Sequence, residues 1–107
     1  MSSRALKLAS KDVEQELASL NRGLTTAWQR TGNKLHKQFI FPDFVTAMRF
    51  MQSAAEKAEA MDHHPEWCNV YNKVTIDLTT HSVGEISSLD FELANSMERL
   101  FESYQNS

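Results

Sequence analysis

The sequence predicts an α+β fold, a two-layer sandwich in which a four-stranded antiparallel sheet is covered on one face by helices, in the order α-β-β-α-β-β-α. Three observations predict it. Apolar residues recur at helical spacing in three segments, four short segments favour strands, and short turns join those strands in two pairs. Hairpins and amphipathic helices of this kind bury their apolar faces against each other. With 107 residues, the chain is expected to be a single domain over 1–107.

The first helix is predicted over about 11–22, after a loose tail at 1–9. Ser10 is a candidate N-cap, because its hydroxyl can accept a free backbone N–H of the first turn. Gly23 suits the C-terminal end, where a left-handed backbone costs glycine little. The apolar face of this helix is formed by Val13, Leu17 and Leu20.

The first hairpin is predicted from two strand-like runs, 27–30 and 35–41, on either side of Thr31-Gly32-Asn33. A Gly-Asn turn between runs of this type is typical of a hairpin. The second run places its apolar residues on one face, and Lys37 is the exception on that face.

A long second helix is predicted to start at Pro42-Asp43, where the Asp43 carboxylate favours the positive end of the helix dipole. It should end near Met61-Asp62, because Pro65 disfavours helical geometry at the residue before it. One apolar stripe follows the helix and consists of Phe44, Ala47, Met48, Met51, Ala54, Ala55 and Ala58. We expect most of the stripe to be core, and its Ala- and Met-rich part also fits a helix–helix interface.

The second hairpin is predicted from strands at 67–71 and 74–79, joined by Asn72-Lys73 as a two-residue turn. In the later strand, apolar and polar residues alternate, which is the period of a half-buried strand. A loop at 82–85 follows.

The last helix is predicted to begin at the capping-box pattern Ser87-x-x-Asp90, with Ile86 packing against Phe91 as a hydrophobic staple. Its buried face is formed by Leu93, Met97, Leu100, Phe101 and Tyr104.

Composition excludes several classes of protein. The formal charge is −3 with no long basic run, which argues against direct nucleic-acid binding. Cys68 is the only cysteine, so an intramolecular disulfide and a zinc site of several cysteines are both excluded. We expect no signal peptide and no membrane span, because no apolar run is long enough. A reducing intracellular compartment is therefore expected.

Three of the four histidines lie in one short stretch, at His63, His64 and His81. Histidine titrates nearest neutral pH, so such a group suggests a proton-transfer site or a metal site. A metal would find three ligands in His63, His81 and Asp62, but no recognised ligand motif accompanies them. The remaining interpretation is a set of structural or solvated histidines, to which we assign His36.

The surrounding sequence closely resembles the pterin-4a-carbinolamine dehydratases, whose animal members are also called dimerization cofactors of a homeodomain transcription factor. The resemblance covers almost the whole chain. It is carried by Trp28, by Lys37-Gln38-Phe39-x-Phe41-x-Asp43-Phe44, by Glu59-x-x-Asp62-His63-His64-Pro65-Glu66-Trp67-x-Asn69-Val70-Tyr71-Asn72-Lys73-Val74, by Leu78-x-Thr80-His81 and by Asp90-x-x-Leu93-Ala94.

The resemblance implies an enzyme that dehydrates 4a-hydroxytetrahydrobiopterin to quinonoid dihydrobiopterin, and so recycles tetrahydrobiopterin for the aromatic amino-acid hydroxylases. No metal and no organic cofactor are implied, since the pterin is the substrate. The resemblance makes His63 and His81 the acid–base pair and gives His64 mainly the task of holding the pterin. Four other residues are implied as substrate contacts or as partners of the histidines, namely Glu59, Asp62, Pro65 and Thr80. Trp28 either walls the pocket or packs as a core aromatic.

The same resemblance implies a homo-oligomer, expected to be a tetramer built from dimers, in the cytoplasm and also in the nucleus. The alternative function is that of a non-catalytic dimerization cofactor that binds a homeodomain transcription factor. Two departures from the family pattern are Leu89, where animal members often have arginine, and Gly84-Glu85-Ile86, where Ala-Gly-Leu is usual. We expect the activity to survive these two departures. If they have an effect, it should be on substrate affinity or on a partner contact at that edge.

Overall fold

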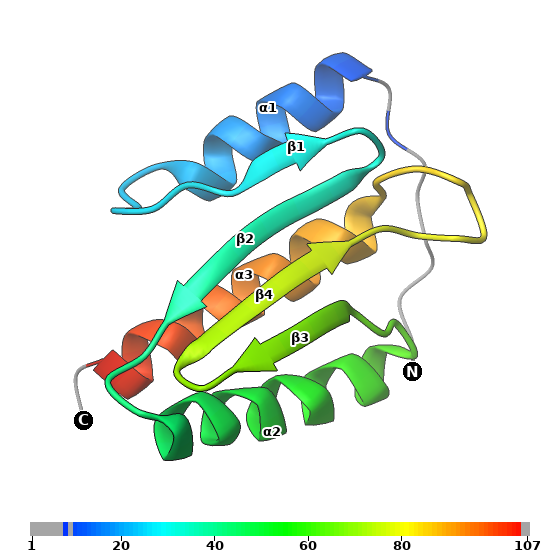
Figure 1. Cartoon of the computed structure of the whole chain (residues 1–107). Coiled ribbons are helices and arrows are strands. Elements are labelled where there is room, and N and C mark those ends of the chain that lie inside the picture. The colour runs from blue at the N-terminus through cyan, green and yellow to red at the C-terminus, as the bar shows by residue number, and fades with distance from the viewer. Residues whose placement is uncertain (1–7, 9, 106–107) are drawn as a thin grey trace.

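The predicted order of elements is confirmed in the computed structural model, which describes residue 8 and residues 10–105 (Figure 1). The elements are α1 (Ser10–Asn21), β1 (Gln29–Thr31), β2 (Lys34–Ile40), α2 (Phe44–Met61), β3 (Glu66–Val70), β4 (Lys73–Leu78) and α3 (Ser88–Gln105). The tail expected at 1–9 lies outside the described residues except for Leu8, which packs against the core. Within the described part of the chain, no helix has the length and apolar character needed to cross a bilayer.

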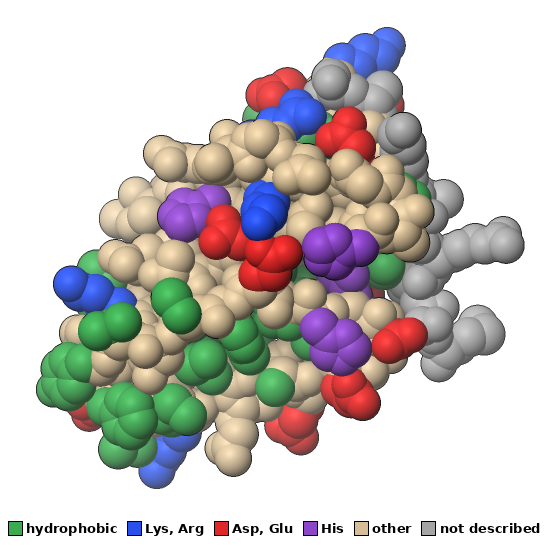
Figure 2. Space-filling model, turned by 45° about the vertical axis from the view of Figure 1, so that its right-hand side comes forward, with side chains coloured by type: hydrophobic (Ala, Val, Ile, Leu, Met, Phe, Trp, Pro, Cys, Tyr) green, Lys and Arg blue, Asp and Glu red, His purple; other side chains and the backbone are tan. Residues whose placement is uncertain are grey.

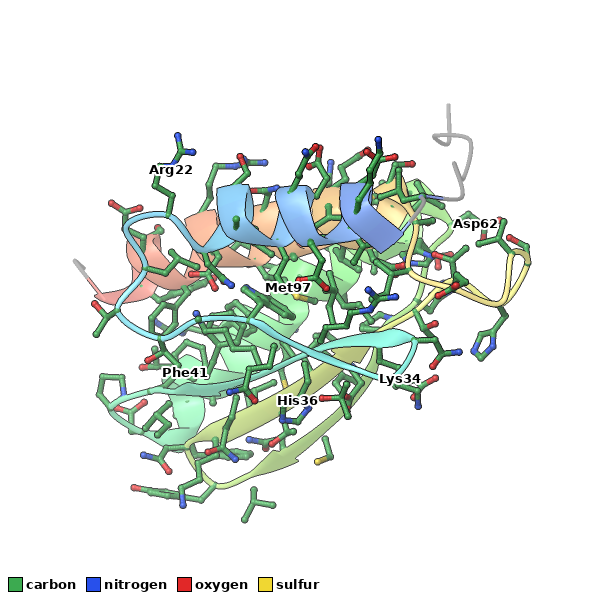
Figure 3. All side chains as sticks on the ribbon, turned by 90° about the horizontal axis from the view of Figure 1, so that it is seen from above. Arg22, Lys34, His36, Phe41, Asp62 and Met97 are labelled. Carbon is green, nitrogen blue, oxygen red and sulfur yellow. The ribbon has the colours of Figure 1, made fainter. Side chains whose placement is uncertain are left out.

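The four strands form one antiparallel sheet in the order β1-β2-β4-β3. Burial alternates along the two central strands, as the sequence period predicts. The buried side chains of β2 and β4 face the helices, and Figure 3 shows α1 and α3 on the same side of the sheet. The opposite face is left open and carries polar side chains, among them His36, Gln38, Thr75 and Asp77.

A cluster of aromatic rings lies in the core. The Phe39 ring lies 5.1 Å from Phe50 and 4.9 Å from Phe101, centroid to centroid. The Trp28 ring meets Phe39 edge to face at 5.8 Å and 75°. Tilted and edge-to-face pairs of this kind are the favoured arrangements of aromatic rings. They join β2, α2 and α3 into one hydrophobic core.

Helix α2 has capped ends. The Asp43 carboxylate accepts a hydrogen bond from the Thr46 backbone N–H at 2.8 Å. Hydrogen bonds from Thr46, the side-chain one first, hold the pKa of Asp43 below its usual range. At the other end, Asp62 takes a left-handed conformation (φ 52°), and the His63 N–H donates back to the Ala58 carbonyl. This turn directs the chain from α2 into the histidine segment.

Both hairpins differ from expectation in detail. Val70 pairs with Lys73, so the second turn is Tyr71-Asn72 and not Asn72-Lys73. The reason is that Asn72 is bound to the end of β2: it exchanges hydrogen bonds with Phe41 through its carbonyl and its side-chain amide. The expected Thr31-Gly32-Asn33 turn contracts to Gly32-Asn33, since Thr31 pairs with Lys34 and Gly32 supplies the positive φ of 63°.

Strand β1 starts at Gln29, later than the expected residue 27. The Trp28 N–H donates to Asn21 Oδ1 at 2.7 Å, and Asn21 Nδ2 donates to the Trp28 carbonyl at 2.9 Å. The backbone of Trp28 is therefore paired with the end of α1 and does not pair with β2.

Lys37 is the polar exception on the buried face of β2, and its side chain is 4% exposed. Its ammonium group donates to Glu98 at 2.5 Å and to the Thr26 carbonyl at 2.7 Å. The same Glu98 oxygen accepts from the Trp28 indole N–H at 2.8 Å. A buried charge is tolerated only when it is paired and hydrogen-bonded in this way.

We predict that Glu98→Gln lowers the free energy of unfolding by about 3 kcal/mol, because it leaves the charge of Lys37 buried without a counter-charge. Urea denaturation at neutral pH measures the change. Lys73→Met, on an exposed lysine at the start of β4, is the control and should change stability by less than about 0.5 kcal/mol. A Glu98→Gln variant as stable as the control would contradict the role given to the ion pair.

Candidate active site

His63 and Asp90 form a buried pair between two helices. His63 follows the C-terminal turn of α2, and Asp90 lies in the first turn of α3. The His63 side chain is 8% exposed, Asp90 is fully buried, and His63 Nε2 lies 2.6 Å from Asp90 Oδ1. The two ends of the pair come from elements 27 residues apart in the sequence, so the tertiary fold makes the contact.

The second carboxylate oxygen of Asp90 also accepts hydrogen bonds. Oδ2 accepts from the Thr80 hydroxyl at 2.8 Å and from the Ser87 N–H at 2.8 Å. The bond from the Ser87 N–H is one of the two reciprocal hydrogen bonds of the predicted capping box, and the Ser87 hydroxyl accepts from Leu89 and not from Asp90. Thr80 and Ser87 hydroxyls also lie 2.6 Å apart, and the Leu89 N–H donates to Ser87 Oγ at 3.2 Å.

These contacts fix the direction of the hydrogen bonds at Oδ2 of Asp90. The backbone N–H groups of Ser87 and Leu89 can only donate, and the Thr80 hydroxyl donates to the carboxylate. Oδ2 of Asp90 is thus an acceptor from the Ser87 N–H and the Thr80 hydroxyl, and a carboxylate at Asp90 requires a hydrogen on the ring nitrogen that faces Oδ1. With Asp90 as a carboxylate, the hydrogen of a neutral His63 ring lies on Nε2, and the lone pair of Nδ1 is available as a base.

His64 points away from this pair, as expected for a neighbouring residue. Its side chain is 61% exposed, and its Nε2 lies 2.8 Å from Glu59 Oε1 on the last turn of α2. The ring is held at the surface by one exposed carboxylate. It can make polar or stacking contacts to a planar ligand more readily than it can act from inside a closed site.

His81 follows β4 and its side chain is 87% exposed. Its Nε2 lies 3.6 Å from Glu66 Oε2, and the other oxygen of Glu66 accepts from the Lys34 ammonium at 2.6 Å. The Lys34 hydrogen bond first, and then the charges of Lys34 and His81, hold the pKa of Glu66 below its usual range. The hydrogen bond to Glu66 and its charge raise the pKa of Lys34.

Asp90 connects the two ends of the site. It binds His63 at the end of α2 and Thr80, the residue before His81, at the end of β4. The backbone at His81 is thus tied to His63 through one carboxylate. Figure 2 shows histidine side chains next to acidic ones on one face of the molecule.

The remaining predicted site residues are divided between this face and the core. Asp62 is an exposed C-cap, Pro65 is half-buried and Thr80 is buried against Asp90. Trp28 is placed in the core, 1% exposed and bonded to Glu98, so the structure does not bring it to the exposed histidines. Within residues 8 and 10–105, no group of three His, Cys, Asp or Glu side chains is arranged to hold a metal ion.

Sequence reasoning missed four residues of this site: Asp90, Ser87, Glu66 and Lys34. The sequence predicts Ser87 and Asp90 as helix-capping residues, and Asp90 also belongs to the motif of the resemblance, but neither is predicted as a site residue. A signal for a second role existed, because an aspartate that caps a helix next to a histidine segment can present its other oxygen to a ring nitrogen. The pairing of Lys34 with Glu66 depends on strand order, which local patterns do not give.

The departures from the family pattern lie in the loop after β4 and in the first turn of α3. Leu89 and Ile86 are buried in the core, and Gly84 adopts a positive φ of 65°. Thr80 forms an isolated antiparallel bridge with Glu85, which closes the loop after β4. Phe91 is also buried in this core region, as the expected staple with Ile86 requires.

A family model described as "Pterin 4 alpha carbinolamine dehydratase" matches residues 6–100. The chain belongs to this family. It is 48% identical over 93 residues to the "Putative pterin-4-alpha-carbinolamine dehydratase" of Solibacter usitatus, covering 87% of this chain and 97% of that protein. A protein of the same name from Sulfurisphaera tokodaii is 39% identical over 94 residues, covering 88% of this chain and 96% of that protein.

Solved structures agree with the fold. A transcriptional coactivator/pterin dehydratase from Brucella melitensis superposes with a TM-score of 0.81 at 36% identity, covering 89% of this chain and 98% of that chain. A pterin dehydratase-like protein, a RuBisCO assembly factor in the alpha-carboxysome, has a TM-score of 0.62 at 21% identity, covering 72% of this chain and 92% of that chain. The second likeness shows the fold alone.

We predict that Asp90→Asn lowers the free energy of unfolding by about 2–3 kcal/mol, because the new amide cannot accept at every position where the carboxylate does. Chemical denaturation measures the change. The control is Asp77→Asn, which alters a half-exposed carboxylate bonded to His36 and should cost less than about 1 kcal/mol. Equal losses of stability in the two variants would show that the hydrogen bonds of Asp90 stabilise the protein no more than the Asp77–His36 contact does.

Proposed function

We propose that this protein dehydrates 4a-hydroxytetrahydrobiopterin to quinonoid dihydrobiopterin and water, and so regenerates the pterin used by aromatic amino-acid hydroxylases. The observation that carries the proposal is the buried Asp90–His63 pair, whose carboxylate also binds the hydroxyl of Thr80, the residue before His81. Membership of the dehydratase family supports the substrate class.

The reaction needs one base and one acid. The base removes the hydrogen from N5, the C4a–O bond breaks as N5=C4a forms, and the acid gives the leaving hydroxyl a proton so that it departs as water. His63 is suited to be the base, because Asp90 holds its Nε2–H and stabilises the imidazolium that forms. His81, beside the Glu66 carboxylate, is suited to be the acid. Each proton transfer is typically worth ~10²–10⁴-fold in rate.

The other exposed residues have binding roles in this proposal. His64, held by Glu59, contacts the pterin ring, and Asp62, Pro65 and Thr80 line or support the same end of the molecule. Proton transfer alone completes the reaction, so we propose that it needs neither a metal ion nor an organic cofactor. Activity should therefore be unchanged by prolonged chelation.

The decisive test is an assay of carbinolamine dehydration with the purified protein and its histidine variants. We predict that His63→Ala and His81→Ala each lower kcat by about 10²-fold, because each removes a proton transfer in the transition state. His64→Ala should raise KM more than it lowers kcat. The double variant of His63 and His81 should lose much less than the product of the single losses.

His36→Ala is the matched control, since His36 is also surface-accessible and bonded to a carboxylate, Asp77, at 2.9 Å. It should retain wild-type kinetics. Wild-type protein without dehydratase activity would overturn the proposed function. If His64→Ala were the most damaging to kcat, or His81→Ala were silent, the proposed division of roles would be wrong.

A surface that we call the apolar patch supports self-association. It consists of the exposed residues Ile40, Phe44, Val45, Met48, Val70 and Tyr71, and Figure 2 shows hydrophobic side chains gathered at one end of the molecule. The predicted stripe of α2 thus serves two purposes, since Ala47, Ala54 and Ala58 are core while Phe44 and Met48 are exposed. Exposed patches of this kind mark interaction sites. We propose a tetramer built from dimers.

The same patch favours the second candidate function, a non-catalytic cofactor that docks on a homeodomain transcription factor. A solved structure 36% identical to this chain is named a transcriptional coactivator as well as a pterin dehydratase. Both roles are compatible, because the patch and the Asp90–His63 pair use different residues. A His63→Ala variant that still bound such a factor would separate the two roles.

We predict that the wild-type protein sediments as an oligomer at micromolar concentration and that Val45→Glu shifts it toward smaller species, because a charge would be buried in the interface. Sedimentation velocity measures both. Ala18→Glu, an exposed change on α1, is the control. A monomeric wild-type protein would refute the proposed association.

A further inference from the structure

We infer that Lys34, acting through Glu66, is a positioning residue for His81, and that the tip of the β1–β2 hairpin braces the segment that carries His81. This inference rests on the proposed function, since it concerns the residue proposed as the acid. Neither Lys34 nor any other residue of that hairpin belongs to the motif around the histidines.

The two oxygens of Glu66 have different partners. Oε1 accepts a hydrogen bond from the Lys34 ammonium at 2.6 Å, while Oε2 lies 3.6 Å from His81 Nε2. A carboxylate anchored at one oxygen has little freedom to rotate, so its second oxygen stays directed at the imidazole. Lys34 therefore sets the orientation of the group that faces His81.

The same hairpin tip also holds the backbone on both sides of His81. The Thr79 hydroxyl donates to the Asn33 carbonyl at 2.7 Å, and Asn33 Nδ2 donates to the Gly84 carbonyl at 3.5 Å. Arg30 adds a longer ion pair to Glu85 at 3.9 Å. Two residues of one hairpin, Asn33 and Arg30, thus make three contacts with the segment from Thr79 to Glu85, on both sides of the histidine.

His81 needs such support more than His63 does. His63 is packed into the protein and bonded to Asp90, whereas the His81 side chain is 87% exposed. An unsupported ring samples many rotamers, and fixing it costs conformational entropy during the reaction. Placing the ring in advance through Glu66 reduces that cost.

Lys34 also balances charge at this point of the sheet. Glu66 and Asp77 are directly opposed on β3 and β4, and like charges in that position repel each other. Lys34 lies on the same face and interacts with both carboxylates. Without the lysine, Glu66 would move away from Asp77 and lose its fixed direction toward His81. Because these groups are exposed and screened by solvent, the expected effect is modest.

The test compares Lys34→Met, Glu66→Gln and Lys34→Arg in the dehydration assay. We expect Lys34→Met and Glu66→Gln to lower kcat by about 3–10-fold with a smaller change in KM. Lys34→Arg should retain most of the wild-type activity. Lys73→Met, which removes an exposed lysine at the far end of β4, is the control and should behave as wild type. Thermal unfolding confirms that each variant is folded.

A double-mutant comparison separates positioning of His81 from any other effect. In a His81→Ala background, Lys34→Met should cause no further loss, because the group that it positions is gone. Two results would overturn the inference and leave the proposed function intact. One is an equal loss from Lys34→Met in the wild-type and His81→Ala backgrounds. The other is full activity of Lys34→Met and Glu66→Gln when His81→Ala lowers activity.

The positioning of the His81 ring can also be measured without the dehydration assay. If His81→Ala were silent, the proposed acid role would fail, but ¹³C relaxation of the His81 ring would still test the positioning. We expect faster ring motion in Lys34→Met than in wild type or Lys73→Met. Unchanged ring motion would overturn the inference.

Discussion

The buried carboxylate of Asp90 is the interaction on which the rest of the site depends. Removing a carboxylate from water is costly unless its lone pairs are satisfied. Here the hydrogen-bond partners come from three places: the end of α2 through His63, the end of β4 through Thr80, and the start of α3 through the Ser87 N–H. Because all three partners bind one residue, Asp90 ties the end of α2, the segment after β4 and the start of α3 together. The orientation of His63 follows from its bond to Asp90.

This constraint explains why histidines that are close in sequence differ so much in environment. His63 is held by the buried side chain of Asp90 and is nearly closed off from solvent, whereas His64 and His81 are exposed and lie beside single surface carboxylates. A ring inside the protein with a fixed tautomer suits a base, and exposed rings suit binding and proton exchange with solvent. The division of labour proposed for them is a consequence of where α2 and β4 end.

The sequence predicted the elements well because their signals are local. The polar–apolar alternation of Val74–Leu78, the Gly32-Asn33 turn and the Ser87-x-x-Asp90 pattern act within a few residues, and each was found in the structure. The errors arose where a distant partner competes: Asn72 is bound to Phe41, and the backbone of Trp28 is bound to Asn21. Contacts between elements, such as Lys34 with Glu66, require the strand order and could not be read from spacing.

The most direct test of the central claim is the tautomer of neutral His63, measured by ¹⁵N NMR of the imidazole nitrogens in the folded protein. Asp90 as an ionised acceptor requires a hydrogen on Nε2 and a bare lone pair on Nδ1. We predict a protonated-type signal for Nε2, with a coupled, slowly exchanging hydrogen, and an unprotonated-type signal for Nδ1. A hydrogen on Nδ1 and a bare Nε2 would mean that Asp90 is itself the donor, and would contradict the proposed origin of the base.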